Sequence, residues 1–118
     1  MHWPTPIVST PVTGDTGPVL VTTEYMINEQ DRENFLKLIG KLSLERGRFG
    51  AYDWGIFEDL SHPGRYLETY LVDSWLEHLR QHHRVTNADR GIEDEIELFL
   101  LKKPAETTHF LAATRKET

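Results

Sequence analysis

The sequence predicts an α+β domain in which a four-stranded antiparallel sheet carries helices on one face. Two observations lead to this fold class. Strand-like segments, rich in alternating, β-branched or aromatic residues, and segments of helical periodicity follow one another in the order βαββαβ. The chain has 118 residues, enough for one domain to bury a core of its own. This order of elements is typical of the ferredoxin-like fold.

The first strand and helix follow an extended segment. Residues 1–17 have no period of 2 or 3.6, which predicts a linker or an N-terminal arm, with His2 and Trp3 in a docking arm or at a truncated junction. Residues 18–27 are predicted to form a strand. Asn28 is placed to cap the helix that follows and ends near Gly47. Two faces are assigned: Val19, Val21, Thr23, Tyr25 and Ile27 along the strand, and Phe35, Leu38, Ile39 and Leu42 along the helix.

The middle of the chain predicts an antiparallel hairpin. Residues 51–60 alternate, with Tyr52, Trp54 and Ile56 on one face and Phe57 on the other. Residues 61–64, Ser-His-Pro-Gly, have turn chemistry, and residues 65–72 form the returning strand.

The last third predicts more helix and a final strand. Ser74 and Glu77 form a capping box that starts a helix. The helical region is expected to be broken or kinked around residues 84–91, as one bent helix or as two. Residues 108–114 are the last strand, so the domain spans residues 18–114 and residues 115–118 form a tail.

Composition excludes several classes of protein. Thirteen Lys and Arg face nineteen Asp and Glu, for a net charge of −6 with both signs scattered, which argues against a nucleic-acid partner. The absence of cysteine excludes disulfides, thiolate catalysis and cysteine-based metal sites, and it favours a cytoplasmic location. No apolar run approaches the roughly 18 residues of a membrane span, and the N-terminus has no signal-peptide pattern.

Apolar residues on both faces of the predicted sheet point to an oligomer. Tyr66 and Tyr70 alternate with Leu67 and Leu71, so a monomer would leave an aromatic or apolar face in water. We therefore expect a homodimer in which two sheets pack face to face.

Histidines are dense between residues 68 and 90, but they do not predict a metal site. His78 and His82 share a helix face at i, i+4, yet no further ligand motif completes the set, and His83 points roughly 100° away from His82. No metal and no cofactor are expected.

Two interpretations of the histidines remain open. In the first, His78 and His82 are half-buried and hydrogen-bonded to the backbone or to Glu68, whose own expected cation is Arg65 or Arg80. In the second, a small apolar or aromatic ligand binds between helix and sheet, and His82 or His78 acts as acid or base. The candidate ligand contacts are Tyr52, Trp54, Tyr70, Trp75, His78 and His82.

Several stretches resemble one bacterial family. They are "HWPTP", "GPVLVTTEYMI", "WGIFED", "PGRYLETYLVDSW" and "EHLRQH" followed by "RVTNADR". Together they resemble the soluble C-terminal tail of major facilitator superfamily exporters of the transmembrane secretion effector type, related to the enterobactin exporter. In that family the tail follows the last membrane helix, and this chain departs from the pattern in having none. The tail is in turn similar to dimeric α/β-barrel proteins such as the antibiotic biosynthesis monooxygenases.

The resemblance implies two alternative functions. The first is a non-catalytic cytoplasmic domain for dimerisation or small-ligand sensing. It either belongs to an efflux transporter, with the membrane portion as partner, or is a free-standing relative derived from one. The second is a small cofactor-independent monooxygenase that acts on an aromatic substrate. Fold alone does not decide between them.

Overall fold

The computed structural model describes residues 16–83 and 87–113, with the side chains of residues 80–89 left aside. The predicted docking residues His2 and Trp3 and the tail at 115–118 lie outside the described residues. The elements are β1 (Val19–Met26), the short 3-10 helix η1 (Glu29–Asp31), α1 (Arg32–Arg48), β2 (Tyr52–Glu58), β3 (Arg65–Val72), α2 (Trp75–His83), α3 (Asn87–Phe99) and β4 (Glu106–Leu111). The predicted order is confirmed, with the second helical region divided into α2 and α3.

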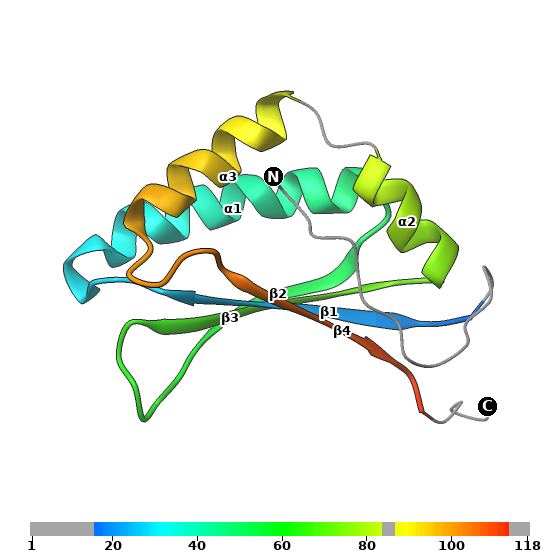
Figure 1. Ribbon diagram of the computed structural model, residues 1–118, viewed down its shortest axis with the longest axis horizontal. Helices are drawn as coiled ribbons and strands as arrows, with labels where there is room; N and C mark the ends of the chain where they lie inside the picture. The colour runs from blue at the N-terminus through cyan, green and yellow to red at the C-terminus, as the bar shows by residue number, and fades with distance from the viewer. Residues whose placement is uncertain (1–15, 84–86, 114–118) are drawn as a thin grey trace.

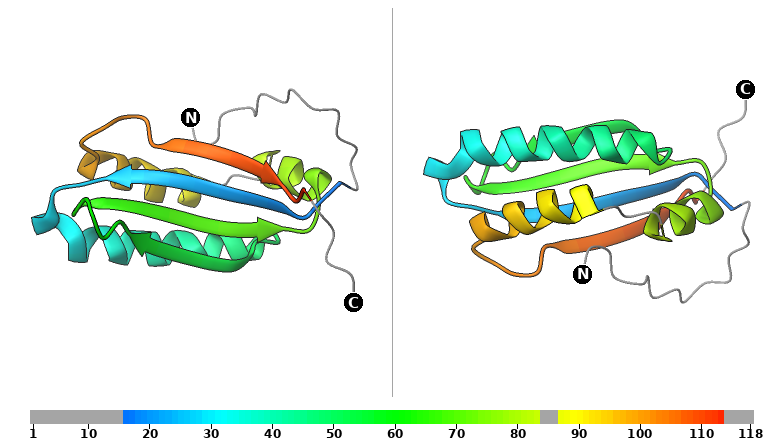
Figure 2. Two further views of the ribbon diagram at one scale, coloured as in Figure 1. Left: turned by 90° about the horizontal axis from the view of Figure 1, so that it is seen from below. Right: turned by 90° about the horizontal axis from the view of Figure 1, so that it is seen from above.

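The four strands form one antiparallel sheet in the order β2-β3-β1-β4. Helices α1, α2 and α3 all cover the same face, and no helix of the described residues lies on the opposite face (Figure 1). Figure 2 shows α1 and α3 side by side, with α2 at the end of the sheet where β1 begins. This arrangement is the predicted ferredoxin-like α+β fold.

Central strand β1 shows the alternation that the sequence predicts. Val19, Val21, Thr23 and Tyr25 are buried beneath the helices, and the residues between them are half-buried on the other face. Ile27 continues the buried series beyond the strand. A β-strand turns successive side chains to opposite faces, so this one strand separates the core from the open side of the sheet.

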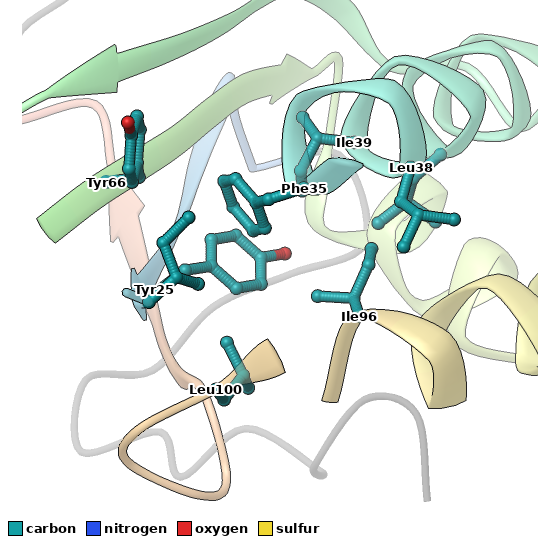
Figure 3. Packing of buried hydrophobic residues seen from close by; sticks show 9 residues of the cluster. Tyr25, Phe35, Leu38, Ile39, Tyr66, Ile96 and Leu100 are labelled. Atoms are coloured by element: carbon teal, nitrogen blue, oxygen red, sulfur yellow. The ribbon is translucent and has the colours of Figure 1, made fainter. Parts of the chain in front are cut away.

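The main core lies between α1, α3 and the sheet (Figure 3). Phe35, fully buried on α1, packs its ring against Tyr25 and Tyr66, at centroid distances of 5.4 and 5.2 Å. Other members of the cluster are Ile27, Leu38, Ile39, Leu42, Ile96 and Leu100. The predicted apolar stripe of α1 therefore faces the sheet, and truncating Phe35 to Ala would cost about 3–5 kcal/mol.

The hairpin between β2 and β3 closes as predicted. Asp59 N–H donates to the Arg65 carbonyl oxygen at 2.8 Å, and the Asp59 carboxylate accepts from Ser61 N–H at 2.8 Å. Gly64 has φ +90°, and a Cβ there would overlap the carbonyl oxygen of Ile27. Only glycine takes this conformation without strain, so Gly64 fixes the turn.

A bulge in β2 overturns one predicted face. Tyr52 pairs with Leu71 and Gly55 pairs with Thr69, so β2 has one residue more than β3 between these two pairs. Asp53 takes up the extra residue with φ +51°. Tyr52 is therefore displaced to the open face, 39% exposed, and does not share the face of Trp54 as strict alternation predicted.

The predicted helix caps have opposite outcomes. Ser74 Oγ accepts the Glu77 backbone N–H at 3.1 Å, which confirms the cap of α2. Asn28 precedes η1 rather than α1 and makes no side-chain cap, so that prediction was wrong. Its backbone carbonyl oxygen accepts from Asp31 N–H at 2.9 Å instead.

Candidate functional site

Buried polar side chains gather on the helix-covered face of the sheet. Among the described residues they are Thr23, Arg46, Glu68 and His78, each at most 6% exposed. Buried polar groups are costly unless they are paired. Their partners therefore decide whether the cluster is structural or is available to a ligand.

Glu68, on β3 and wholly buried, is the centre of one closed network. Its carboxylate accepts Arg46 Nε at 3.0 Å, Arg46 NH2 at 3.1 Å, Tyr25 Oη at 2.8 Å and Trp54 Nε1 at 2.8 Å. Arg46 also lies 4.0 Å from Glu93 of α3. The network therefore ties α1, α3, β1, β2 and β3 together.

The cation that pairs with Glu68 differs from the one expected. Arg65 was a predicted partner, but it lies on the other face of the sheet and binds Glu24 and Asp59, each at 2.7 Å. Residues 65 and 68 are three apart in a strand, so they face opposite sides. The side chain of Arg80, the other predicted partner, lies outside the described residues.

Electrostatics keep this network charged. Burial by itself raises the pKa of the Glu68 carboxyl, but the Arg46 charge and the hydrogen bonds from Arg46, Trp54 and Tyr25 hold the pKa below its ordinary value. Burial and the Glu68 charge raise the pKa of Tyr25. Neither group changes its protonation near neutral pH, so the network binds the layers together and performs no proton transfer there.

Tyr70 lies beside the network and has different surroundings. Its ring faces the Arg46 guanidinium, 5.0 Å from ring centroid to Cζ. Its hydroxyl is buried and has no hydrogen-bond partner within the described part of the chain. Burial raises the pKa of Tyr70, so the hydroxyl is a neutral potential donor.

A second cluster joins α2 to β4 through three rings. The His78 and His109 rings are 4.5 Å apart, and the Trp75 ring lies 5.5 Å from His78 and 6.4 Å from His109. Tyr70 and His109 flank Val21 in the strand register, so both lie on the same row of the sheet. Trp54 and Trp75 both pack against the buried group that includes Tyr70.

The structure brings together four of the six candidate ligand contacts. Trp54, Tyr70, Trp75 and His78 all lie between helices and sheet. Tyr52 lies on the opposite face because of the bulge. The side chain of His82, the other candidate acid or base, lies outside the described residues, and its role stays a prediction.

Two further residues, Arg46 and His109, belong to this region. Neither is among the candidate site residues that the sequence predicts. Strand alternation could have found His109, because Thr107 and His109 point to the helix side together when β4 pairs with β1. No group of three metal-ligating side chains occurs among the residues that the structure describes.

The opposite face of the sheet, here called the open sheet face, carries apolar side chains. Phe57, Leu67 and Phe110 are 59, 36 and 49% exposed. Leu20 and Leu71 are half-buried beside them, and Thr22, Thr69 and Thr108 form a row across the middle. Phe57 lies over Gly55, where an added Cβ would come within 2.6 Å of its ring.

The comparison with protein families decides the relationship. The family model described as transmembrane secretion effector matches residues 1–117. The chain belongs to the transmembrane secretion effector family. Within residues 16–83 and 87–113, no helix of this family member is long and apolar enough to cross a membrane.

Solved structures resemble this secretion effector chain in fold. SnoaB, a cofactor-independent oxygenase from Streptomyces nogalater, has a TM-score of 0.68 at 10% identity, with 83% of this chain and 95% of SnoaB covered. An antibiotic biosynthesis monooxygenase has a TM-score of 0.65 at 14% identity, covering 81 and 99%. A conserved protein from Methanosarcina mazei has a TM-score of 0.68 at 15% identity, covering 80 and 91%.

These likenesses support the fold and leave activity open. All three structures share too little sequence with this chain to carry a function across. No curated protein matches the chain in sequence.

Proposed function

We propose that this chain is the cytoplasmic dimerisation domain of a secretion exporter of the major facilitator type, and that two copies pack through the open sheet face. The observation that carries the proposal is the set of large apolar side chains on that face. Phe57, Leu67 and Phe110 come from three different strands and stand in solvent in a single copy. Exposed large apolar side chains gathered on one face mark interaction surfaces.

A second copy is the occupant that fits this face best. The helix-free face of one sheet matches the same face of another, and two sheets pack about 10 Å apart with interdigitated side chains. Glu24 and Asp59 both bind Arg65 of the same chain, each at 2.7 Å. In a twofold pairing these carboxylates keep this cation while the apolar rows of two copies come together.

Light scattering on two matched variants tests the proposal. Leu67→Arg places a cation directly opposite Glu24 on β1, so the single copy gains a favourable pair while the face between copies becomes charged. Leu44→Arg, on α1 at a site 71% exposed and away from the open sheet face, is the control. We expect dimers for the wild type and Leu44→Arg. For Leu67→Arg we expect the dimer dissociation constant to rise by at least roughly 100-fold.

Two outcomes contradict the proposal. One is a monomeric wild-type chain at tens of micromolar concentration. The other is a Leu67→Arg variant that dimerises as tightly as Leu44→Arg. Membership of an exporter is tested separately, since the proposal expects membrane-spanning segments encoded upstream in the same reading frame.

A cofactor-independent oxygenase is a second candidate, favoured by one observation. The buried Tyr70 hydroxyl has no partner within the described residues, and such a group can hold a substrate oxygen. Oxygen uptake with aromatic hydroquinones tests it. Uptake that the Tyr70→Phe and His82→Ala variants lose would support the oxygenase, whereas uptake no faster than without protein would contradict it.

A further inference from the structure

Residues 16–18, which lead into β1, are held by two backbone hydrogen bonds, one from the start of α2 and one from the residue after β4. The Thr16 carbonyl oxygen accepts the Trp75 N–H at 2.7 Å, and the Pro18 carbonyl oxygen accepts the Ala112 N–H at 3.1 Å. Between them, a Cβ on Gly17 would overlap the Asp73 carbonyl oxygen and crowd the Ser74 Cα. Residues 16–18 are therefore pressed onto the junction of β3 and α2 and onto the end of β4.

This segment supplies part of the cap of α2. The first backbone N–H groups of a helix have no partner inside the helix. In α2 the Trp75 N–H is satisfied by Thr16, and the Glu77 N–H is satisfied by Ser74 Oγ at 3.1 Å. The Ser74 cap comes from the residue just before the helix. The Thr16 cap comes from a distant part of the chain, the segment that precedes β1.

Helix α2 depends on such contacts more than its neighbours do. It has 9 residues, and isolated helices of that length are unstable in water. Helices α1 and α3 pack against each other, whereas the described part of α2 contacts β3 and, through His78, His109 of β4 at the end of the sheet (Figure 2). Elements with few packing contacts open at the lowest free energy, so α2 responds most readily to a change in its cap.

The first residue of α2 also leads into the buried rings. Trp75, whose N–H is held by Thr16, has its ring 5.5 Å from His78 and 6.4 Å from His109. His78 is 1% exposed and the His109 ring is 4.5 Å away. Trp75 therefore connects Thr16 directly to the interface of α2 and β4, and a displacement of Thr16 would move Trp75 at that interface.

We propose that residues 16–18 form a joint through which the chain segment preceding β1 sets the position of α2 and of the His78–His109 ring pair. A pull on that segment withdraws the Thr16 cap, loosens the first turn of α2 and separates Trp75 from the two imidazoles. If the domain belongs to an exporter, as proposed above, the joint carries conformational change between the preceding chain and the region beneath α2.

Hydrogen exchange on the full chain tests the joint with two variants. Gly17→Ala adds a methyl group where backbone atoms already lie, and insertion of two glycines after Gly17 shifts Thr16 out of register without adding bulk. We expect amides of Trp75–His83 to exchange about fivefold faster or more in each variant, with α1 unchanged, because one net hydrogen bond and its packing are lost. Gly40→Ala, in α1 with nothing within 4 Å of the new Cβ, is the matched control.

The result that would overturn the joint is exchange in α2 within about twofold of the wild type in both variants, a change smaller than one net hydrogen bond produces. If Gly17→Ala fails to fold, the insertion variant decides. Light scattering on the same samples separates the two proposals. A variant that remains a dimer while α2 exchanges faster supports the joint irrespective of the interface, and a monomeric wild type would contradict dimerisation alone.

Discussion

Replacing Glu68 by Gln removes the charge at the centre of the buried network without changing its size. Each carboxylate oxygen accepts two donors, one from Arg46 and one from Tyr25 or Trp54. Whichever way the new amide is turned, its NH2 group faces two donors that have lost their acceptor. Arg46, 4% exposed, is then left with Glu93 at 4.0 Å as its nearest acidic partner.

The magnitude follows from the burial of both charges. Breaking a buried ion pair by removing one partner costs about 3–5 kcal/mol, because a charge remains without compensation in a low dielectric. No discount for solvent screening applies, since Glu68 is 0% exposed. A domain of this size is stable by about 5–15 kcal/mol, so Glu68→Gln is expected to fold and to unfold far more easily.

Urea unfolding followed by circular dichroism measures the effect. With a slope of about 1–3 kcal/mol per molar urea, the midpoint of Glu68→Gln should fall by roughly 1–5 M at fixed protein concentration. Arg48→Gln, which changes a side chain 72% exposed and breaks its pair with Glu45 at 3.4 Å, is the control and should lose about 1 kcal/mol or less. A loss for Glu68→Gln no larger than for the control would refute the assigned role of the network.

Three further predictions concern single groups. Tyr70→Phe removes a buried hydroxyl without a partner in the described residues, so thermal melting should show a stability unchanged or raised by about 1 kcal/mol; a clear loss would reveal a partner. Gly64→Ala places a side chain at φ +90° and should lower the melting temperature. Gly40→Ala should raise the melting temperature, because it adds about 1 kcal/mol or less to the free energy of unfolding. The pKa values of Glu68 and Asp59 are lowered by folding, that of Asp59 to about 2, so both stabilise the fold above their unfolded pKa values near 4. Stability should therefore fall as pH drops from about 4 toward 2, and a flat profile in urea titrations over that window would contradict both assignments.

Local patterns were sufficient for most of the fold. In β1 and in α1, the spacing of apolar residues along a few neighbouring positions determines which side is buried. Both buried sides were predicted correctly. The turn at Gly64 and the cap at Ser74 are likewise encoded within a few residues. Such features depend on local geometry, which is why the sequence carries them.

Features that depend on tertiary register were not predictable in the same way. The displacement of Tyr52 follows from a bulge at Asp53, and nothing in a strict alternation marks an extra residue. Arg46 continues the apolar stripe of α1, four residues after Leu42, but its partner Glu68 is 22 residues away and is met only when α1 packs on the sheet. His109 needed the pairing of β4 with β1 before its face could be assigned.

Radical footprinting of the chain at low and high protein concentration tests the proposed interface most directly. If two copies pack through the open sheet face, side-chain oxidation of Phe57, Leu67 and Phe110 should fall as the dimer forms. Leu44, 71% exposed on α1 and therefore on the helix-covered side of the sheet, should stay equally reactive. Oxidation of Phe57, Leu67 and Phe110 that does not change while the measured mass rises to twice the 13.7 kDa of one chain would contradict the account.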